Sequence, residues 1–412
     1  PGPQPPVARL GPAQGKAGSG EWEGREVPRK MPAREILDLT VCEPALGSGA
    51  FAIEAVRQLA AAYLRRKREE TGARIAPDAY AAELQKVKTY IALHNVYGVD
   101  LNGTAVELAE ISLWLDTMGK GLQAPWFGLH LKRGNSLIGA RRAVYRRDQL
   151  AKKAWLTAVP TDVPLTPSDA DRAAGRSSSL GDVSGRIHHF LLPAAGWGSA
   201  VEAKEAKELA PKALARLKAW RKTVLVTPSK KQADELVNLG HRVEALWDLA
   251  HQRLRIAEDQ IRRSIDVWGA DDLPVGGAVT REQIEEALAD AKGAYQRLRL
   301  VMDAWCALWF WPLTDGLTRV KHDDGYEVVV EPPTLDEWIA GLRAVLGVHA
   351  ETGASGRGRK WTGGDQTLAS TADWDELNEA EELELSFAGA QAPERVLRDH
   401  LWLVVGLRGA GL

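Results

Sequence analysis

The segment LTVCEPALGSGAF at residues 39–51 constrains the fold of this chain more than any other. An apolar run stops at Glu43, and two glycines, Gly47 and Gly49, follow before a stretch with helical spacing begins at Ala50. Glycines between a strand and a helix let the backbone approach a ligand closely, and the helix N-terminus offers free N–H groups and a positive dipole end. The segment therefore predicts a strand, a turn that contacts a ligand, and a helix.

Short apolar strands alternate with helices along the following hundred residues. The expected strands are Ile36–Cys42, Val96–Val99 and Leu129–Lys132, and the expected helices are Ala50–Arg68, Pro77–Leu93 and Thr104–Leu115. Strands in series with helices between them favour a parallel sheet that is covered by helices. The expected fold class is therefore α/β, with a partial Rossmann-like parallel sheet followed by a long, mainly α-helical insert.

Changes in composition divide the chain into six expected segments. They are a Pro/Gly-rich disordered tail (1–34), the Rossmann-like domain (35–145), a linker or loop region (146–200), the helical insert with a β-hairpin near 317–330 (201–348), a flexible linker (349–372) and a truncated C-terminal segment (373–412). Three capping-box pairs are expected to begin helices of the insert: Ser229 with Gln232, Thr280 with Gln283, and Thr334 with Glu337. The hairpin is expected to turn at Asp324-Gly325.

Composition excludes several classes of protein. With two cysteines, a disulfide scaffold or a cysteine zinc site is excluded. No run approaches the ~18 apolar residues of a membrane span and no signal peptide is visible, so we expect a cytoplasmic protein without a membrane partner. The net charge is −2, so a nucleic acid would have to bind a local basic patch. Arg141–Lys153 is one candidate, and a solvated helix face is the alternative for it.

Two polar residues follow the second and third expected strands. Asp100 ends the second strand, where a carboxylate can accept hydrogen bonds from both hydroxyls of a ribose. Asn135 follows the third strand, where an amide can pair with an adenine edge. Each feature alone is also typical of an ordinary turn or surface loop. Together with the glycine turn they describe a nucleoside ligand without a required diphosphate, because the third glycine of a dinucleotide fingerprint and the lysine of a P-loop are both missing.

S-adenosylmethionine is a nucleoside of this kind. Its amino-acid end would lie by the glycine turn, its ribose at Asp100 and its adenine near Asn135. The sequence therefore predicts S-adenosyl-L-methionine as the cofactor.

Three segments, EPALGSGAFAIEAVRQLA, VYGVDLNGTAVELAEISLWLDT and LHLKRGNSLIG, resemble successive motifs of the large amino-methylating DNA methyltransferases. The similarity is to the N6-adenine enzymes of type II-G restriction–modification and of phage-defence islands of the DISARM and phage-exclusion kinds, and it covers about residues 36–140. It implies a class I methyltransferase fold over residues 35–145. The cofactor-binding residues that it implies are Glu43, Ala45, Gly47, Gly49, Asp100 and Asn135, with Phe51 packing nearby. Glu43 stands where the family usually has Asp, and Leu46 replaces the usual Cys or Met.

These enzymes hold the target adenine with an Asn/Asp-Pro-Pro-aromatic tetrad, which accepts hydrogen bonds from the exocyclic amine and stacks on the flipped base. The Pro-Pro that follows the glycine motif is Glu331-Pro332-Pro333-Thr334, which has neither end of the tetrad. We interpret it as a turn in front of a helix that Thr334 caps. The sequence therefore assigns no catalytic residue and predicts that this chain, as a piece of a longer enzyme, is inactive alone.

The function expected from the resemblance is that of a site-specific DNA adenine-N6 methyltransferase. Its partners would be double-stranded DNA with a flipped adenine, in the full-length enzyme, and subunits of a defence system. A non-catalytic scaffold or interaction subunit with a vestigial nucleotide pocket is the alternative. A methyltransferase that acts on RNA or protein is a third hypothesis. A sheet that lacks later strands would expose an edge and an apolar face.

Overall fold

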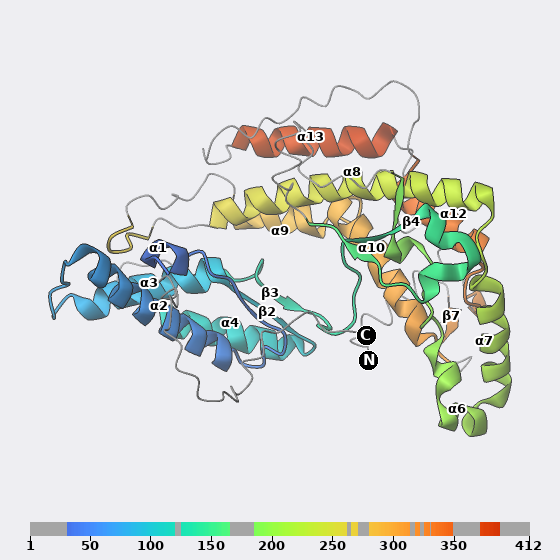
Figure 1. The fold of residues 1–412 in the computed structure, drawn as a ribbon, viewed down its shortest axis with the longest axis horizontal. Helices are drawn as coiled ribbons and strands as arrows, with labels where there is room; N and C mark the ends of the chain where they lie inside the picture. Colours follow the sequence, from blue (N-terminus) through green and yellow to red (C-terminus); the bar gives the residue numbers. More distant parts are fainter. Residues whose placement is uncertain are drawn as a thin grey trace, which may run out of the picture.

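The computed structural model describes residues 31–119, 125–164, 185–261, 265–270, 280–313, 318–321, 325–329, 331–348 and 371–387. The expected tail up to residue 30, most of the linker at 349–372 and the segment after 387 lie outside these described residues. Figure 1 shows an α/β unit, in blue and cyan, beside a mainly helical unit in green to orange. The long helix α8 (Lys230–Ile261) extends from the helical unit towards the α/β unit.

The α/β unit is built on a three-stranded parallel sheet in the order β1-β2-β3. Its strands are β1 (Val41–Glu43), β2 (Val96–Asp100) and β3 (Leu131–Arg133). Glu43 pairs with Gly98, and Asp100 pairs with Arg133, so the carboxyl ends of the strands lie along one edge. The expectation of a mixed α/β fold with a parallel sheet is confirmed. Among the described residues β1 is an edge strand, and Cys42 on it is exposed.

Four helices accompany this sheet: α1 (Ala33–Ile36), α2 (Ala50–Thr71), α3 (Tyr80–Asn95) and α4 (Gly103–Thr117). The strand expected over Ile36–Cys42 was wrong over residues 36–40, because β1 begins at Val41. Ile36 ends α1, and both Ile36 and Leu37 are buried in the core that also contains residues of α2. These residues are apolar because they pack against a helix, and not because they lie inside a sheet.

The core of the α/β unit also receives residues from far along the chain. Ile265, Val267 and Ala270 follow α8 and are buried among side chains of α2 and α3. The hydroxyl of Tyr63 on α2 donates a 3.0 Å hydrogen bond to the carbonyl of Trp268. The end of α8 is thereby fixed to the α/β unit.

A small antiparallel sheet and three 3-10 helices begin the second unit. The sheet has the order β5-β4-β6, with β4 (Ala143–Arg146), β5 (Thr161–Asp162) and β6 (Arg186–His188). The 3-10 helices are η1 (Arg147–Leu156), η2 (His189–Leu191) and η3 (Ser199–Glu202). The basic stretch Arg141–Lys153 therefore contains the strand β4 and part of η1, and its Arg142 is buried.

The helical unit contains α6 (Lys204–Leu209), α7 (Pro211–Val224), α8, α9 (Arg281–Ala289), α10 (Ala294–Ala307), η4 (Leu308–Phe310), α12 (Leu335–Leu346) and α13 (Thr371–Phe387). The hairpin consists of β7 (Arg319–Lys321) and β8 (Glu327–Val329), and Gly325 of its expected turn has a φ of 84°. All three expected capping boxes are present.

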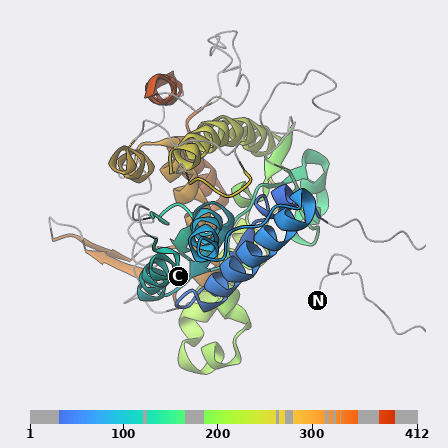
Figure 2. The ribbon, with the colours of Figure 1, turned by 90° about the vertical axis from the view of Figure 1, so that its left-hand side faces the viewer.

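Figure 2 shows α13 end-on above α8, with which it is in contact. None of the described helices is long and apolar enough to cross a membrane.

Tryptophan side chains hold the helical unit together. The chain has 15 tryptophans, and five buried indoles each donate a hydrogen bond to a backbone carbonyl. These bonds join Trp155 to Pro193 (3.0 Å), Trp197 to Trp305 (3.0 Å), Trp220 to Pro333 (2.7 Å), Trp305 to Leu192 (2.8 Å) and Trp338 to Leu191 (2.9 Å). An indole fills a large volume and still satisfies a buried carbonyl, so irregular segments can lie inside this core without an unpaired acceptor.

Candidate ligand-binding site

The glycine turn between β1 and α2 is held against β2. The N–H of Leu46 donates to the carbonyl of Val99 at 3.0 Å, and the N–H of Gly49 donates to Leu46 at 2.9 Å. Gly49 has a φ of 82°, and a Cβ built on it would lie 3.2 Å from the Cβ of Ala109 on α4. Gly47 has a φ of 54°, but nothing lies within 4 Å of the place that its Cβ would take. Gly49 is therefore required by packing as well as conformation, whereas Gly47 borders open space that a ligand could enter.

Asp100 lies directly beside this turn. Its Oδ2 accepts a 2.8 Å hydrogen bond from the N–H of Gly47, and its Oδ1 accepts a 2.8 Å hydrogen bond from the N–H of Asn102. The bonds from Asn102 and Gly47 lower the pKa of Asp100 below its ordinary value. The carboxylate is thus ionised at neutral pH, and each of its oxygens can accept more than one hydrogen bond.

Glu43 and Ala45 form the start of the turn. Oε1 of Glu43 accepts a 3.0 Å hydrogen bond from the N–H of Ala45. Because Glu43 ends β1 and its register partner lies two residues before Asp100, both carboxylates belong to the same edge of the sheet. The side chain of Glu43, one methylene longer than that of Asp, bends back to the backbone of the turn that follows it.

Asn135 organises the loop that follows β3. Its Oδ1 accepts hydrogen bonds from the N–H groups of Leu137 (2.9 Å) and Ile138 (3.2 Å). The N–H of Gly134 donates to the carbonyl of Asp100 at 2.9 Å and ties this loop to the end of β2. The loop that contains Asn135 therefore lies beside the end of β2, and the role of Asn135 towards a ligand stays a prediction.

Large apolar side chains are exposed at the same edge. Phe51 in the first turn of α2 is 77% exposed, and Leu137 is 93% exposed. Leu101, which follows Asp100, is 49% exposed. The sequence predicted Phe51 at this edge but not the two leucines. Their position could have been inferred, because each leucine follows a predicted site residue, Asp100 or Asn135, within two positions.

The Pro-Pro segment lies outside this edge. Thr334 caps α12 by accepting a hydrogen bond from the N–H of Glu337, and Trp220 donates to the carbonyl of Pro333. The expected helix cap at Thr334 is confirmed, whereas residues 331–333 in front of it are not a turn. Within the described ranges, no group of three or more His, Cys, Asp or Glu side chains has the arrangement of a metal site.

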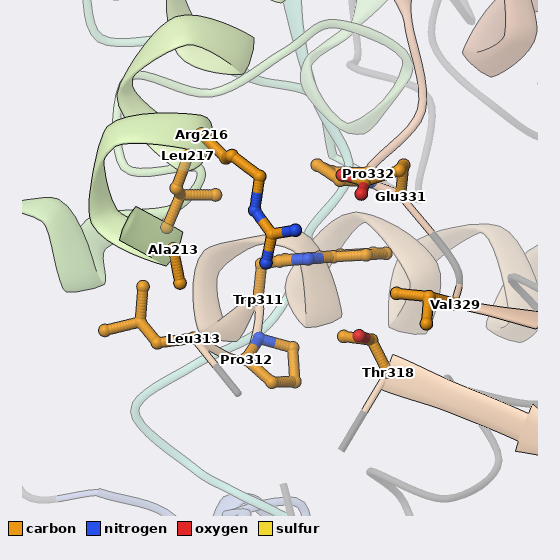
Figure 3. Close-up of a pocket in the computed structure, with 10 residues that line it drawn as sticks. All are labelled: Ala213, Arg216, Leu217, Trp311, Pro312, Leu313, Thr318, Val329, Glu331 and Pro332. Carbon is orange, nitrogen blue, oxygen red and sulfur yellow. The ribbon is translucent and has the colours of Figure 1, made fainter. Parts of the chain in front are cut away.

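A separate small pocket lies in the helical unit. Figure 3 shows Arg216 of α7 reaching over Trp311, with Glu331 and Pro332 on the facing segment and Thr318 below. The pocket contains none of the predicted site residues. The nucleoside prediction therefore concerns the carboxyl edge of the parallel sheet alone.

Comparisons with known proteins bear on the α/β unit. Residues 26–123 match the family model described as MmeI, DNA-methyltransferase domain. A protein of Methanocaldococcus jannaschii, described as a putative type II restriction enzyme and methyltransferase, is 33% identical over 117 residues, which are 26% of this chain and 9% of that protein. No solved structure matches. These similarities support a DNA-methyltransferase domain of the restriction–modification kind in the first part of the chain.

Proposed function

We propose that this chain is the cofactor-binding part of an S-adenosylmethionine-dependent DNA adenine-N6 methyltransferase from a restriction–modification or phage-defence system. The observation that carries the proposal is the ionised Asp100, which is hydrogen-bonded to Gly47 of a glycine turn at the start of a helix. The similarity of residues 26–123 to the MmeI methyltransferase domain supports it.

The residues of this edge fit the parts of the cofactor by their chemistry. Asp100 would accept hydrogen bonds from the ribose hydroxyls, as carboxylates at the end of a second strand do in nucleotide-binding folds. Gly47 leaves room for the methionine part, and the N-terminus of α2 behind it favours its carboxylate. The loop of Asn135, with the exposed Leu137, would contact the adenine. When bound, the cofactor supplies a methyl group on a sulfonium sulfur.

The choice of adenine as the target comes from the resemblance of the motifs. The sequence contains no Asn/Asp-Pro-Pro-aromatic tetrad, so no residue of this chain is assigned to methyl transfer. Double-stranded DNA and subunits of a defence system are the proposed partners of the longer enzyme. Detection of N6-methyladenine after incubation of duplex DNA with this chain alone would contradict the prediction that the chain lacks the residues for methyl transfer.

Calorimetric titration of S-adenosylmethionine into the folded chain tests the proposal. We expect Asp100→Ala to weaken binding about 30- to 150-fold, because losing a charged acceptor of two ribose hydroxyls removes about 2–3 kcal/mol. Asp38→Ala is the matched control, since Asp38 is an exposed carboxylate of the same unit whose ion pair, among the described residues, is with Arg34 one turn before it. Absence of binding to a chain with normal folding would reject the cofactor assignment and favour the scaffold alternative.

A further inference from the structure

Helix α7 and the segments next to it carry an unusual excess of positive charge. No acidic residue occurs between Glu208 and Asp234. The same stretch contains Lys212, Arg216, Lys218, Arg221, Lys222, Lys230 and Lys231. The whole chain has a net charge of −2, so this excess is a local feature of the helical unit.

The outward face of α7 presents cations in two rows. Lys212 and Arg216 are one helical turn apart, as are Lys218 and Lys222, and all four are exposed, with the guanidinium of Arg216 turned over Trp311. The exposed residues between the two rows are small: Ala215, Ala219 and Thr223. The opposite face of the helix is buried through Leu214, Leu217, Trp220 and Val224. A polyanion could thus approach the helix backbone closely and meet cations on either side.

The segment around η1 extends this basic face. Nζ of Lys153 donates a 2.5 Å hydrogen bond to the carbonyl of Leu225, which places η1 beside the end of α7. Arg147 pairs with Asp234 at the start of α8, and Arg146 pairs with Asp148. We call the exposed residues of 146–153 and 211–234 the α7 surface. The two segments contain eleven basic residues and two acidic ones, and both carboxylates are already paired with arginine.

Six lysines of the α7 surface make no ion pair with another described residue: Lys152, Lys212, Lys218, Lys222, Lys230 and Lys231. Unpaired like charges that lie together repel one another, and an approaching polyanion removes that repulsion. Lysines of this kind bind phosphates as point charges without reading the base sequence. In Figure 1 the surface lies at the end of the helical unit that is farthest from the α/β unit.

We infer that the α7 surface binds the sugar–phosphate backbone of duplex DNA. The choice of DNA among polyanions rests on the proposed function. With 14 residues, α7 is about 21 Å long, and a stretch of duplex of that length carries about twelve phosphates on its two strands. The surface would hold the substrate without determining its recognition sequence.

Fluorescence anisotropy with a labelled 20-base-pair duplex, at 50 to 200 mM salt, tests the inference on the complete 412-residue chain. Each lost phosphate contact lowers the slope of log K against log salt by about 0.9. For the double variant Lys218→Gln/Lys222→Gln we expect a slope reduced by about 2, so that affinity falls about tenfold less across this salt range than for the parent chain. Ala219→Glu is a second variant, which places a carboxylate between the two rows and should weaken binding at low salt.

The matched control removes the same charge elsewhere. Arg65→Gln/Arg68→Gln lies at the exposed C-terminal end of α2, and we expect it to leave the salt slope unchanged. An unchanged slope in both α7 variants, or no duplex binding by the folded parent chain at 50 mM salt, would overturn the inference. Tighter binding of single-stranded RNA than of duplex DNA would overturn the choice of DNA.

Titration of S-adenosylmethionine into the same preparations keeps the inference separate from the proposed function. Cofactor binding without α7-dependent DNA binding would reject DNA binding by the α7 surface and retain the proposed function. DNA binding that depends on the α7 lysines, in a chain that binds no cofactor, would retain DNA binding by the α7 surface and reject the proposed function.

Discussion

The backbone N–H of Gly47 donates a 2.8 Å hydrogen bond to Oδ2 of Asp100, 53 residues further along the chain. This bond connects the turn after β1 to the end of β2. The second carboxylate oxygen is fixed by the N–H of Asn102, so both oxygens have a set orientation without a ligand. Such a preorganised acceptor loses little conformational entropy when a ligand binds to it.

Substitution of Asp100 should release the two backbone amides that it holds. We expect the Gly47 and Asn102 amides of Asp100→Ala to exchange with solvent about tenfold faster, which corresponds to about 1.4 kcal/mol of lost protection. Asp100→Asn keeps one oxygen acceptor, so one of the two amides should remain protected. Amide exchange followed by NMR measures this, and equal protection in all three proteins would show that Asp100 does not order the turn.

The pH dependence of the same amides follows from the lowered pKa of Asp100. Because the folded-state pKa lies below the unfolded value, the stabilisation is present above about pH 4 and is lost as the pH falls through the folded pKa. Protection of the Gly47 amide should therefore be unchanged from pH 7 to pH 5 and weaken only in stronger acid.

The two glycines of the turn should respond differently to alanine. Both have a positive φ, which disfavours an L-residue by about 1–2 kcal/mol. At Gly49 the added Cβ also approaches Ala109 to 3.2 Å, whereas at Gly47 it meets open space. We expect Gly47→Ala to lower the free energy of unfolding by about 1 kcal/mol and Gly49→Ala by about 2–4 kcal/mol. Urea denaturation compares the two, and equal losses would mean that contact with α4 does not restrict the turn.

Much of the site could be predicted because its signals are local. Glycines follow the first short apolar run and an aspartate ends the second, and in a parallel sheet all carboxyl ends of the strands meet at one edge. The sequence alone therefore predicted that Gly47, Asp100 and Asn135 lie at one edge of the sheet. The capping boxes at Ser229, Thr280 and Thr334 were equally local and all begin helices.

The remaining features depend on contacts that a local pattern does not contain. Ile36 has the same apolar character in a helix that packs on α2 as it would have in a strand. Residues 265–270 return to the core of the α/β unit. The spacing of apolar residues in the helical region does not predict this return. The β4 strand was missed because it lies within a basic stretch, and Arg142 directly before it is buried and paired with Glu244.

The contact between Tyr97 and Glu258 should couple the sheet to α8. The Tyr97 hydroxyl donates a 2.9 Å hydrogen bond to Oε1 of Glu258, and Tyr97 also stacks on His130 at 4.1 Å between ring centroids. In a double-mutant cycle of Tyr97→Phe and Glu258→Ala, in which alanine removes the acceptor, we expect a coupling energy of about 1 kcal/mol. Tyr63→Phe removes a different hydroxyl that contacts Trp268, so its cycle with Glu258→Ala is the control and should be additive within about 0.5 kcal/mol. Additivity in both cycles would mean that the hydroxyl contributes nothing to the attachment of α8.

A pair of buried histidines should make the helical unit sensitive to mild acid. Nε2 of His188 lies 2.6 Å from Oε1 of Glu244, and Nδ1 of His188 is buried without a hydrogen-bond partner in the described structure. Burial lowers the pKa of His188 even though Glu244 opposes this, and burial lowers the pKa of the neighbouring His189 to about 4. Both rings are therefore neutral at pH 7, with His188 donating its Nε2 hydrogen to the Glu244 carboxylate.

The sign of the pH effect follows from those lowered values. Between pH 6.5 and about 4 the unfolded chain binds protons that the folded chain does not, so folding becomes less favourable as the pH falls through this range. For His189 alone the loss amounts to about 2 kcal/mol at pH 5 relative to pH 7. We expect His189→Gln to reduce the difference between urea midpoints at pH 7 and pH 5, and replacement of His188 as well to reduce it further. A pH dependence equal to that of the parent chain in His189→Gln would contradict the assignment, because it would mean that protonation of another group destabilises this core.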